Sequence, residues 1–118
     1  MNDYTVVLPS TSRTTTQTKR LMVGDTKGCI VVLHMTTVGS GSVTLSINGY
    51  DKVNGATWTI LTGSAVTTNT TNVYRVYPGL TASANATVSD ILPRELQIVV
   101  TANNANAAVY SVSVNTVS

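Results

Sequence analysis

Short runs in which apolar and hydroxyl-bearing residues alternate recur along this chain and constrain its fold more than any other feature. The clearest run is residues 42–47, where Val43, Leu45 and Ile47 alternate with Ser and Thr. Alternation with a period of two is typical of a strand with one buried and one exposed face. Turn-forming residues recur about every 8 to 12 residues, and no helical periodicity of about ten residues or more interrupts them. The pattern predicts an all-β protein, an antiparallel β-sandwich or small barrel of about seven strands.

The expected strands either alternate in this way or form one continuous apolar run. They are residues 4–8, 28–38, 42–47, 56–62, 73–77, 94–101 and 107–114. Glycine and asparagine in the intervening turns predict two hairpins, one joining the third and fourth of these strands and one joining the last two. In the first hairpin, the alternation places Trp58 beside Ile60 on the buried face. Pro78 and Gly79 predict a type II turn at the end of the strand before them.

The N-terminal part of the chain differs from the rest. Residues 10–20 contain no apolar side chain that could be buried, so about residues 9–27 are expected to form an extended arm or a long loop. Such a segment could lie across a neighbouring subunit or simply be a solvated loop. A length of 118 residues is typical of one domain, so residues 1–118 are expected to form a single all-β domain.

The surface is expected to carry few charges. Only 10% of the residues are charged, the net charge is +2, and Thr, Ser and Asn supply most of the polar side chains. An average soluble domain has about a quarter of its residues charged. A weakly charged surface of this kind indicates that partner subunits cover part of it. An ordinary β-domain with one hydroxyl-rich face is the alternative.

The residue types needed for catalysis or metal binding are scarce and scattered. His34 is the only histidine and lies five residues from the only cysteine, Cys29, so the two side chains fall on opposite faces of one strand. The five acidic residues show no close pairing along the sequence and no calcium-loop spacing, and no zinc-ligand cluster occurs. We therefore expect no enzymatic activity, no catalytic or metal site and no cofactor. Cys29 is expected to be a buried, unreactive thiol.

The candidate functional residues are therefore those typical of protein interfaces, which are enriched in tyrosine and arginine. They are Arg13, Lys19, Arg20, Tyr50, Tyr74, Arg75 and Tyr77. The N-terminus has no basic stretch followed by an apolar segment, and no apolar run approaches the roughly 20 residues of a membrane span. We expect a protein made in the cytoplasm and not secreted, without a membrane partner. The basic residues are spread out and lack interleaved aromatics, so we do not expect a nucleic-acid partner.

Several segments resemble small proteins encoded in the structural modules of tailed bacteriophages. The similar pieces are residues 41–51, 56–61, 73–81, Asn85 and residues 92–94, within about residues 28–114. The most specific piece reads Arg-Val-Tyr-Pro-Gly-Leu at residues 75–80, followed by Asn85 and by Leu-Pro-Arg at 92–94. The N-terminal segment lies outside the similarity.

The resemblance implies a virion structural protein. The role it favours is a capsid decoration or cement protein that binds the outer surface of the phage head in many copies and stabilises it. Its partners would be the major capsid protein or other virion subunits, and copies of itself in a homo-oligomer. Three alternatives remain open: a tail-tube or neck component at the head–tail junction, a glycan- or host-binding β-sandwich module, and a small coat protein.

Overall fold

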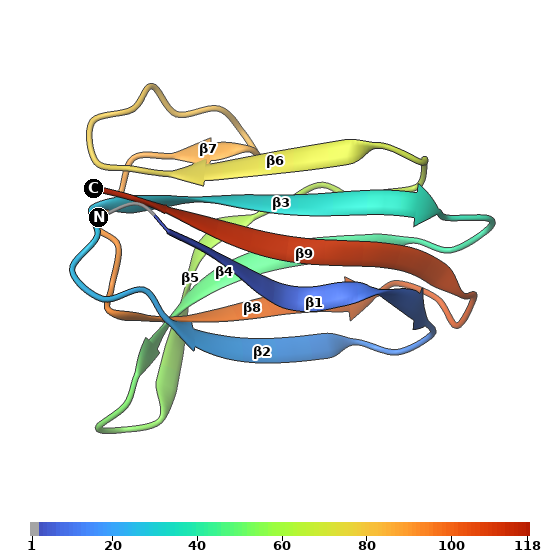
Figure 1. Ribbon diagram of the computed structural model, residues 1–118, viewed down its shortest axis with the longest axis horizontal. Helices are drawn as coiled ribbons and strands as arrows, with labels where there is room; N and C mark the ends of the chain where they lie inside the picture. The colour runs from blue at the N-terminus through green and yellow to red at the C-terminus, as the bar shows by residue number, and fades with distance from the viewer. Residues whose placement is uncertain (1–2) are drawn as a thin grey trace.

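The computed structural model describes residues 3–118 and consists of strands and loops, without a helix (Figure 1). Nine strands follow one another along the chain: β1 (Asp3–Arg13), β2 (Gln17–Met22), β3 (Gly28–Thr37), β4 (Val43–Asp51), β5 (Ala56–Thr62), β6 (Thr71–Val76), β7 (Thr87–Val88), β8 (Glu95–Ala102) and β9 (Ala108–Val117). The prediction of an all-β protein is confirmed, with nine strands where the sequence indicated about seven. The additional strands are β2 and the two-residue β7.

The strands form two sheets in a sandwich-like arrangement. One sheet has five strands in the order β1-β9-β3-β6-β7, and the other has four in the order β2-β8-β4-β5. Neighbours are antiparallel except for β6 and β7, which run parallel. The register pairs Asp3 with Thr116, so the two ends of the chain lie at the same end of the molecule (Figure 1).

Alternate residues of the inner strands build one hydrophobic core between the sheets. In β4, Val43, Leu45 and Ile47 are buried while the residues between them are partly exposed. The same alternation runs through β3, β8 and β9. The side chains with the least exposed surface are Val31, Leu33, Leu45, Ile47, Val76, Leu96, Ile98, Val100 and Val112. Branched aliphatic side chains therefore supply most of the core, as their preference for strands favours.

The prediction that residues 9–27 form an arm or a long loop is wrong for most of that segment. Strand β1 continues through Pro9 to Arg13, and β2 occupies residues 17–22. Both strands lie at sheet edges, where a residue without an N–H group is tolerated. The register of β1 against β9 shifts twice around Pro9, between Val6 and Leu8 and between Leu8 and Thr11. An edge strand pairs with only one neighbouring strand. A run of hydroxyl residues can therefore join the sheet here without an apolar pattern of its own.

One of the two predicted hairpins is confirmed and the other is wrong. Strands β4 and β5 pair with each other through the turn at residues 52–55. Strands β8 and β9 do not pair, because β8 lies between β2 and β4 while β9 lies between β1 and β3. Residues 103–107 therefore carry the chain from one sheet to the other. Alternation shows which face of a strand is buried, but it does not show which strand is its neighbour.

Tyr110 contributes the largest of the fully buried side chains, and its hydroxyl has no hydrogen-bond partner among residues 3–118. The ring also packs under the Arg13 guanidinium, 4.7 Å from the ring centroid. A buried hydroxyl without a partner costs about 1–3 kcal/mol of desolvation. The substitution Tyr110→Phe removes this cost and keeps the ring under Arg13.

We expect Tyr110→Phe to raise the free energy of unfolding by about 1 kcal/mol in urea titrations followed by circular dichroism. Tyr77→Phe serves as the control, because the Tyr77 hydroxyl donates only a long bond of 3.4 Å to the carbonyl of Ser118. That control should change stability by less than about 0.5 kcal/mol. A clear loss of stability in Tyr110→Phe would contradict the interpretation.

Candidate functional site

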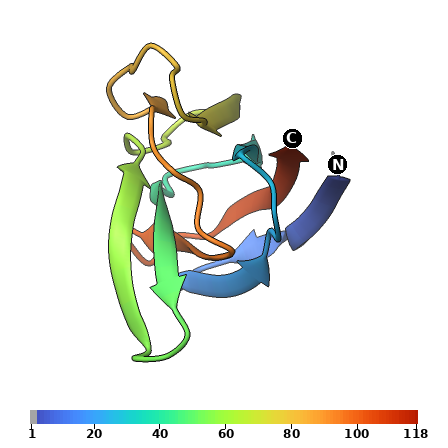
Figure 2. The ribbon, with the colours of Figure 1, turned by 90° about the vertical axis from the view of Figure 1, so that its left-hand side faces the viewer.

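The two ends of the sandwich differ in the side chains that their loops carry. Loops 23–27, 52–55, 77–86 and 89–94 lie at one end, which we call the cleft end; Figure 2 looks onto it. Loops 14–16, 38–42, 63–70 and 103–107 lie at the opposite end, which we call the polar end. Within the described part of the chain, seven large hydrophobic residues are exposed, and six of them lie at the cleft end: Tyr4, Met22, Val53, Trp58, Leu80 and Ile91.

Charge follows the same division. The four loops of the polar end contain no charged residue. Their asparagines bond within the protein: the Asn103 amide donates to the hydroxyls of Ser42 at 2.9 Å and Thr44 at 3.0 Å. The loops of the cleft end carry Asp25, Lys27, Lys52, Asp90 and Arg94. Exposed apolar side chains and charges at one set of loops mark the cleft end as the candidate functional site.

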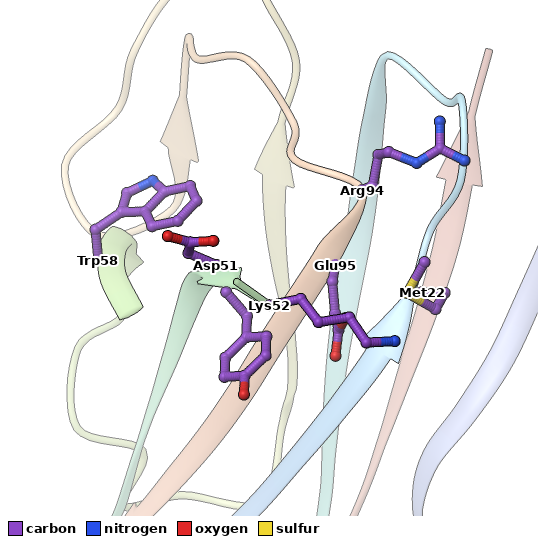
Figure 3. A pocket seen from close by; sticks show the side chains of 7 residues that line it. Met22, Asp51, Lys52, Trp58, Arg94 and Glu95 are labelled. Carbon is purple, nitrogen blue, oxygen red and sulfur yellow. The ribbon is translucent and has the colours of Figure 1, made fainter. Parts of the chain in front are cut away.

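A cleft of about 550 Å³ opens at this end, beside the β4–β5 hairpin. Its lining comes from four strands and two loops and consists of Met22, Tyr50, Asp51, Lys52, Trp58, Arg94 and Glu95. Figure 3 shows Trp58 and Asp51 on one side, Met22 and Arg94 on the other, and Lys52 and Glu95 between them. The ends of β2, β4, β5 and β8 converge here, which places residues from distant parts of the sequence around one opening.

Trp58 was expected in the core and instead lines the cleft, with 47% of its side chain exposed. It pairs with Gly49 across the hairpin, and a Cβ at residue 49 would meet the indole, with Cη2 only 2.7 Å away. The register of β4 with β5 shifts next to Asn48, so Ile60 and Leu61 are both buried and the alternation breaks. Trp58 therefore lies in the last row of the hairpin that is in register with the core, and the tip of the β4–β5 hairpin continues beyond it (Figure 2).

The structure brings two of the predicted interface residues together beside the cleft. The Arg20 guanidinium lies over the Tyr50 ring, 4.4 Å from its centroid. Arg20 lies on β2 and Tyr50 on β4, so the contact spans the intervening strand β8. A cation above an aromatic ring is attracted by the negative face of the ring. Lys19 is also exposed, but it pairs with Ile98, whose side chain points to the core. Lys19 therefore projects from the opposite face of β2 to Arg20 and does not reach Tyr50.

The charges at the cleft are of both signs. Hydrogen bonds from Asn54 Nδ2 at 2.8 Å and from the Val53 N–H at 3.0 Å lower the pKa of Asp51 and keep its carboxylate ionised. Arg94 forms an ion pair with Asp25 at 2.5 Å, but both side chains are largely exposed, so the pair contributes little to stability. Salt bridges of this kind can instead be exchanged for contacts with a partner.

The remaining predicted residues lie elsewhere. Tyr74 is buried beneath the five-stranded sheet, where burial raises the pKa of its hydroxyl, so it is not available to a partner. Arg13 folds back at the polar end and donates to the carbonyl of Tyr110 at 2.6 Å. Arg75 and Tyr77 lie at the cleft end but line a second pocket of about 300 Å³ on the five-stranded sheet, with Leu80.

Within residues 3–118, no group of three or more His, Cys, Asp or Glu side chains could hold a metal ion. His34 is exposed and its Nδ1 shares a hydrogen bond of 2.9 Å with the Thr71 hydroxyl. Cys29 is buried on the opposite face of β3, as the sequence predicted. The described part of the chain contains no helix suited to crossing a membrane.

The buried Cys29 thiol predicts how the free energy of unfolding changes at alkaline pH. Burial raises its pKa from 9.0 to about 12. The thiol of the unfolded chain ionises near its ordinary pKa while the folded thiol stays protonated, so folding stability is complete below pH 9 and falls as the pH rises toward 12. We expect the free energy of unfolding, measured in urea at several values of pH above 8, to fall more steeply for the wild type than for Cys29→Ala. Parallel slopes would contradict the prediction.

Six residues of the cleft were not among the predicted interface residues: Met22, Asp51, Lys52, Trp58, Arg94 and Glu95. They lie in or next to the ends of four strands, and only the strand order brings those ends together. The comparisons with known proteins add no information about the site, since no protein-family model matches the chain and no curated protein matches it significantly.

Proposed function

We propose that this protein is a capsid decoration or cement protein that attaches through its cleft end to the subunits of an assembled phage head. The observation that carries the proposal is the gathering of the exposed hydrophobic residues at the cleft end, opposite an end whose loops are uncharged and bonded internally. A surface of this kind differs from scattered exposed apolar residues, which occur on any soluble protein.

The chemistry of the cleft matches that of binding sites for protein surfaces. Binding energy at interfaces concentrates on a few tryptophan, tyrosine and arginine side chains surrounded by residues that exclude water. Trp58 and Tyr50 line the cleft with Met22, whose flexible thioether adapts to differently shaped partners. The Arg20 guanidinium lies over the Tyr50 ring and restricts its motion, so the ring loses less conformational freedom when a partner binds.

Stabilisation of a shell follows from such attachment by mass action. A ligand that binds only the assembled shell lowers the free energy of that shell in proportion to RT ln(1 + [L]/Kd), where [L] is the concentration of the free ligand. Many copies on one shell add their contributions. The sequence resemblance at residues 75–80 and 92–94 supports the assignment to a phage head, and the low charge of the surface supports coverage by partner subunits.

The exposure of Trp58 favours a second candidate, a glycan- or host-binding module. Sugar rings bind on exposed aromatic faces with polar groups at the rim. The cleft offers Trp58 and Tyr50 with the carboxylates of Asp51 and Glu95 nearby. This candidate predicts saturable binding of oligosaccharides, with a change in the fluorescence of Trp58, the only tryptophan.

Sedimentation of the protein with undecorated phage heads tests the first proposal, with the bound copies counted per particle. Saturation at a fixed number of copies, and shells that resist dissociation better when saturated, are the expected results. Absence from the pelleted shells would overturn the proposal. If the protein alone then formed rings or tubes, a tail or neck subunit would replace it; if it bound oligosaccharides, the second candidate would.

A further inference from the structure

The four edge strands of the two sheets differ in how well they are protected against pairing with another chain. An edge strand exposes N–H and C=O groups that have no partner within the sheet, and proteins commonly protect such edges with charges, proline, register shifts or short length. Strand β1 contains Pro9 and two register shifts. Strand β2 carries Lys19 and Arg20, and β7 has only two residues.

Strand β5 has no charge and no proline in its seven residues. Its first four residues, Ala56, Thr57, Trp58 and Thr59, are all exposed. These residues pair with the end of β4 next to the hairpin turn, while Ile60 and Leu61 are buried and follow the register shift. Residues 56–59 therefore form an accessible edge whose side chains favour strand pairing.

We propose that residues 56–59 of β5 pair, antiparallel, with the same residues of a second copy of this chain. The proposal does not rest on attachment to a shell. Among the edge strands longer than two residues, only β5 is uncharged, so pairing β5 with itself brings no charge onto the shared edge. Pairing with β1 or β2 of another copy would meet Pro9 or place Lys19 and Arg20 beside an apolar strand.

The strand is also compatible with twofold symmetry, as a contact between identical surfaces requires. An axis beside Trp58 sets Thr57 of one copy opposite Thr59 of the other, which aligns residues that share a face of the sheet. The two Trp58 side chains then lie opposite each other, and cross-strand aromatic pairs stabilise such ladders. The four-stranded sheets of the two copies become one eight-stranded sheet, and the two clefts lie side by side.

A contact formed by so few residues is smaller than a standard protein interface of about 1,600 Å², so we expect a dimer that dissociates on dilution. Analytical ultracentrifugation over a hundredfold range of protein concentration should show monomer at the low end and dimer at the high end. Hydrogen exchange at residues 56–59 should slow as the concentration rises. Wild-type protein that stays monomeric throughout, or that dimerises without slower exchange in β5, would overturn the proposal.

The substitution Thr57→Lys adds the charge that edge strands ordinarily use against pairing. We expect it to raise the concentration of half-dissociation by tenfold or more. Thr101→Lys is the matched control, because Thr101 is also an exposed threonine of the four-stranded sheet but lies on β8, between β2 and β4. Equal effects of the two variants would overturn the assignment to β5. Shell binding is measured separately, so either result can fail without the other.

Discussion

The substitution Gly28→Ala is expected to destabilise the protein by about 3 kcal/mol or more, the upper range for forcing extra volume into a packed interior. Gly28 is buried at the start of β3, beside the end of β6. A Cβ there would overlap the backbone carbonyl oxygen of Val76 and lie 2.5 Å from Cδ2 of the Tyr77 ring. The carbonyl cannot move away without separating β3 from β6. Relieving the clash would therefore weaken the hydrogen bonds between these two strands.

Gly49→Ala is the matched comparison, since Gly49 is also a buried strand glycine with a side chain pressed against it. The obstacle there is the indole of Trp58, which is half-exposed and can rotate into the cleft. The gain from a less flexible unfolded chain, about 0.4–1 kcal/mol, is common to both variants. Urea denaturation should therefore show a loss for Gly49→Ala of about 1 kcal/mol. If the losses of stability in Gly28→Ala and Gly49→Ala lay within about 0.5 kcal/mol of each other, the Val76 carbonyl would not be a more rigid obstacle than the Trp58 indole.

The strands that bury apolar side chains could be predicted from the sequence because their pattern is set by burial. Strand β5 has the predicted bounds, β3 ends one residue before its predicted end, and β8 is shifted by one residue at both ends. The prediction failed for β2 and for the second half of β1, whose hydroxyl residues become strand only by pairing with β8 and β9. It failed also for the partner of β9. Such pairings depend on contacts between distant segments, which a local pattern does not contain.

The candidate site was predicted in part for the same reason. Tyr50 and Arg20 were chosen as candidates from their residue types, and the structure places them in contact. Tyr74 was chosen on the same ground and is buried, because its place in β6 directs it to the core. Trp58 was assigned to the core by alternation, and it does share a face with the buried Gly49, but it lies near the turn of the hairpin and stays 47% exposed. Residue type thus selected the candidates, whereas their location depends on the topology of the sheets.

Under the proposed function, Met22→Asp is expected to weaken binding to undecorated heads by about 30-fold or more, the effect of losing about 2 kcal/mol at a central interface residue. Met22 lines the cleft from β2, on the side opposite Trp58, and 59% of its side chain is exposed. A carboxylate there would need to lose its water on contact with an apolar partner surface, which is costly without a paired cation.

Val6→Asp is the control, because Val6 is an apolar strand residue with 60% of its side chain exposed but lies on β1, away from the cleft. We expect its binding to stay within about threefold of the wild type, the change typical of a surface residue outside the interface. Trp58→Ala should reproduce the loss seen in Met22→Asp. Because Met22 lies on β2, at the other edge of the sheet, whereas Trp58 belongs to β5, a loss confined to Trp58→Ala would assign shell binding to the hairpin edge and not to the cleft. Equal losses in Met22→Asp and Val6→Asp would exclude the cleft as the attachment site.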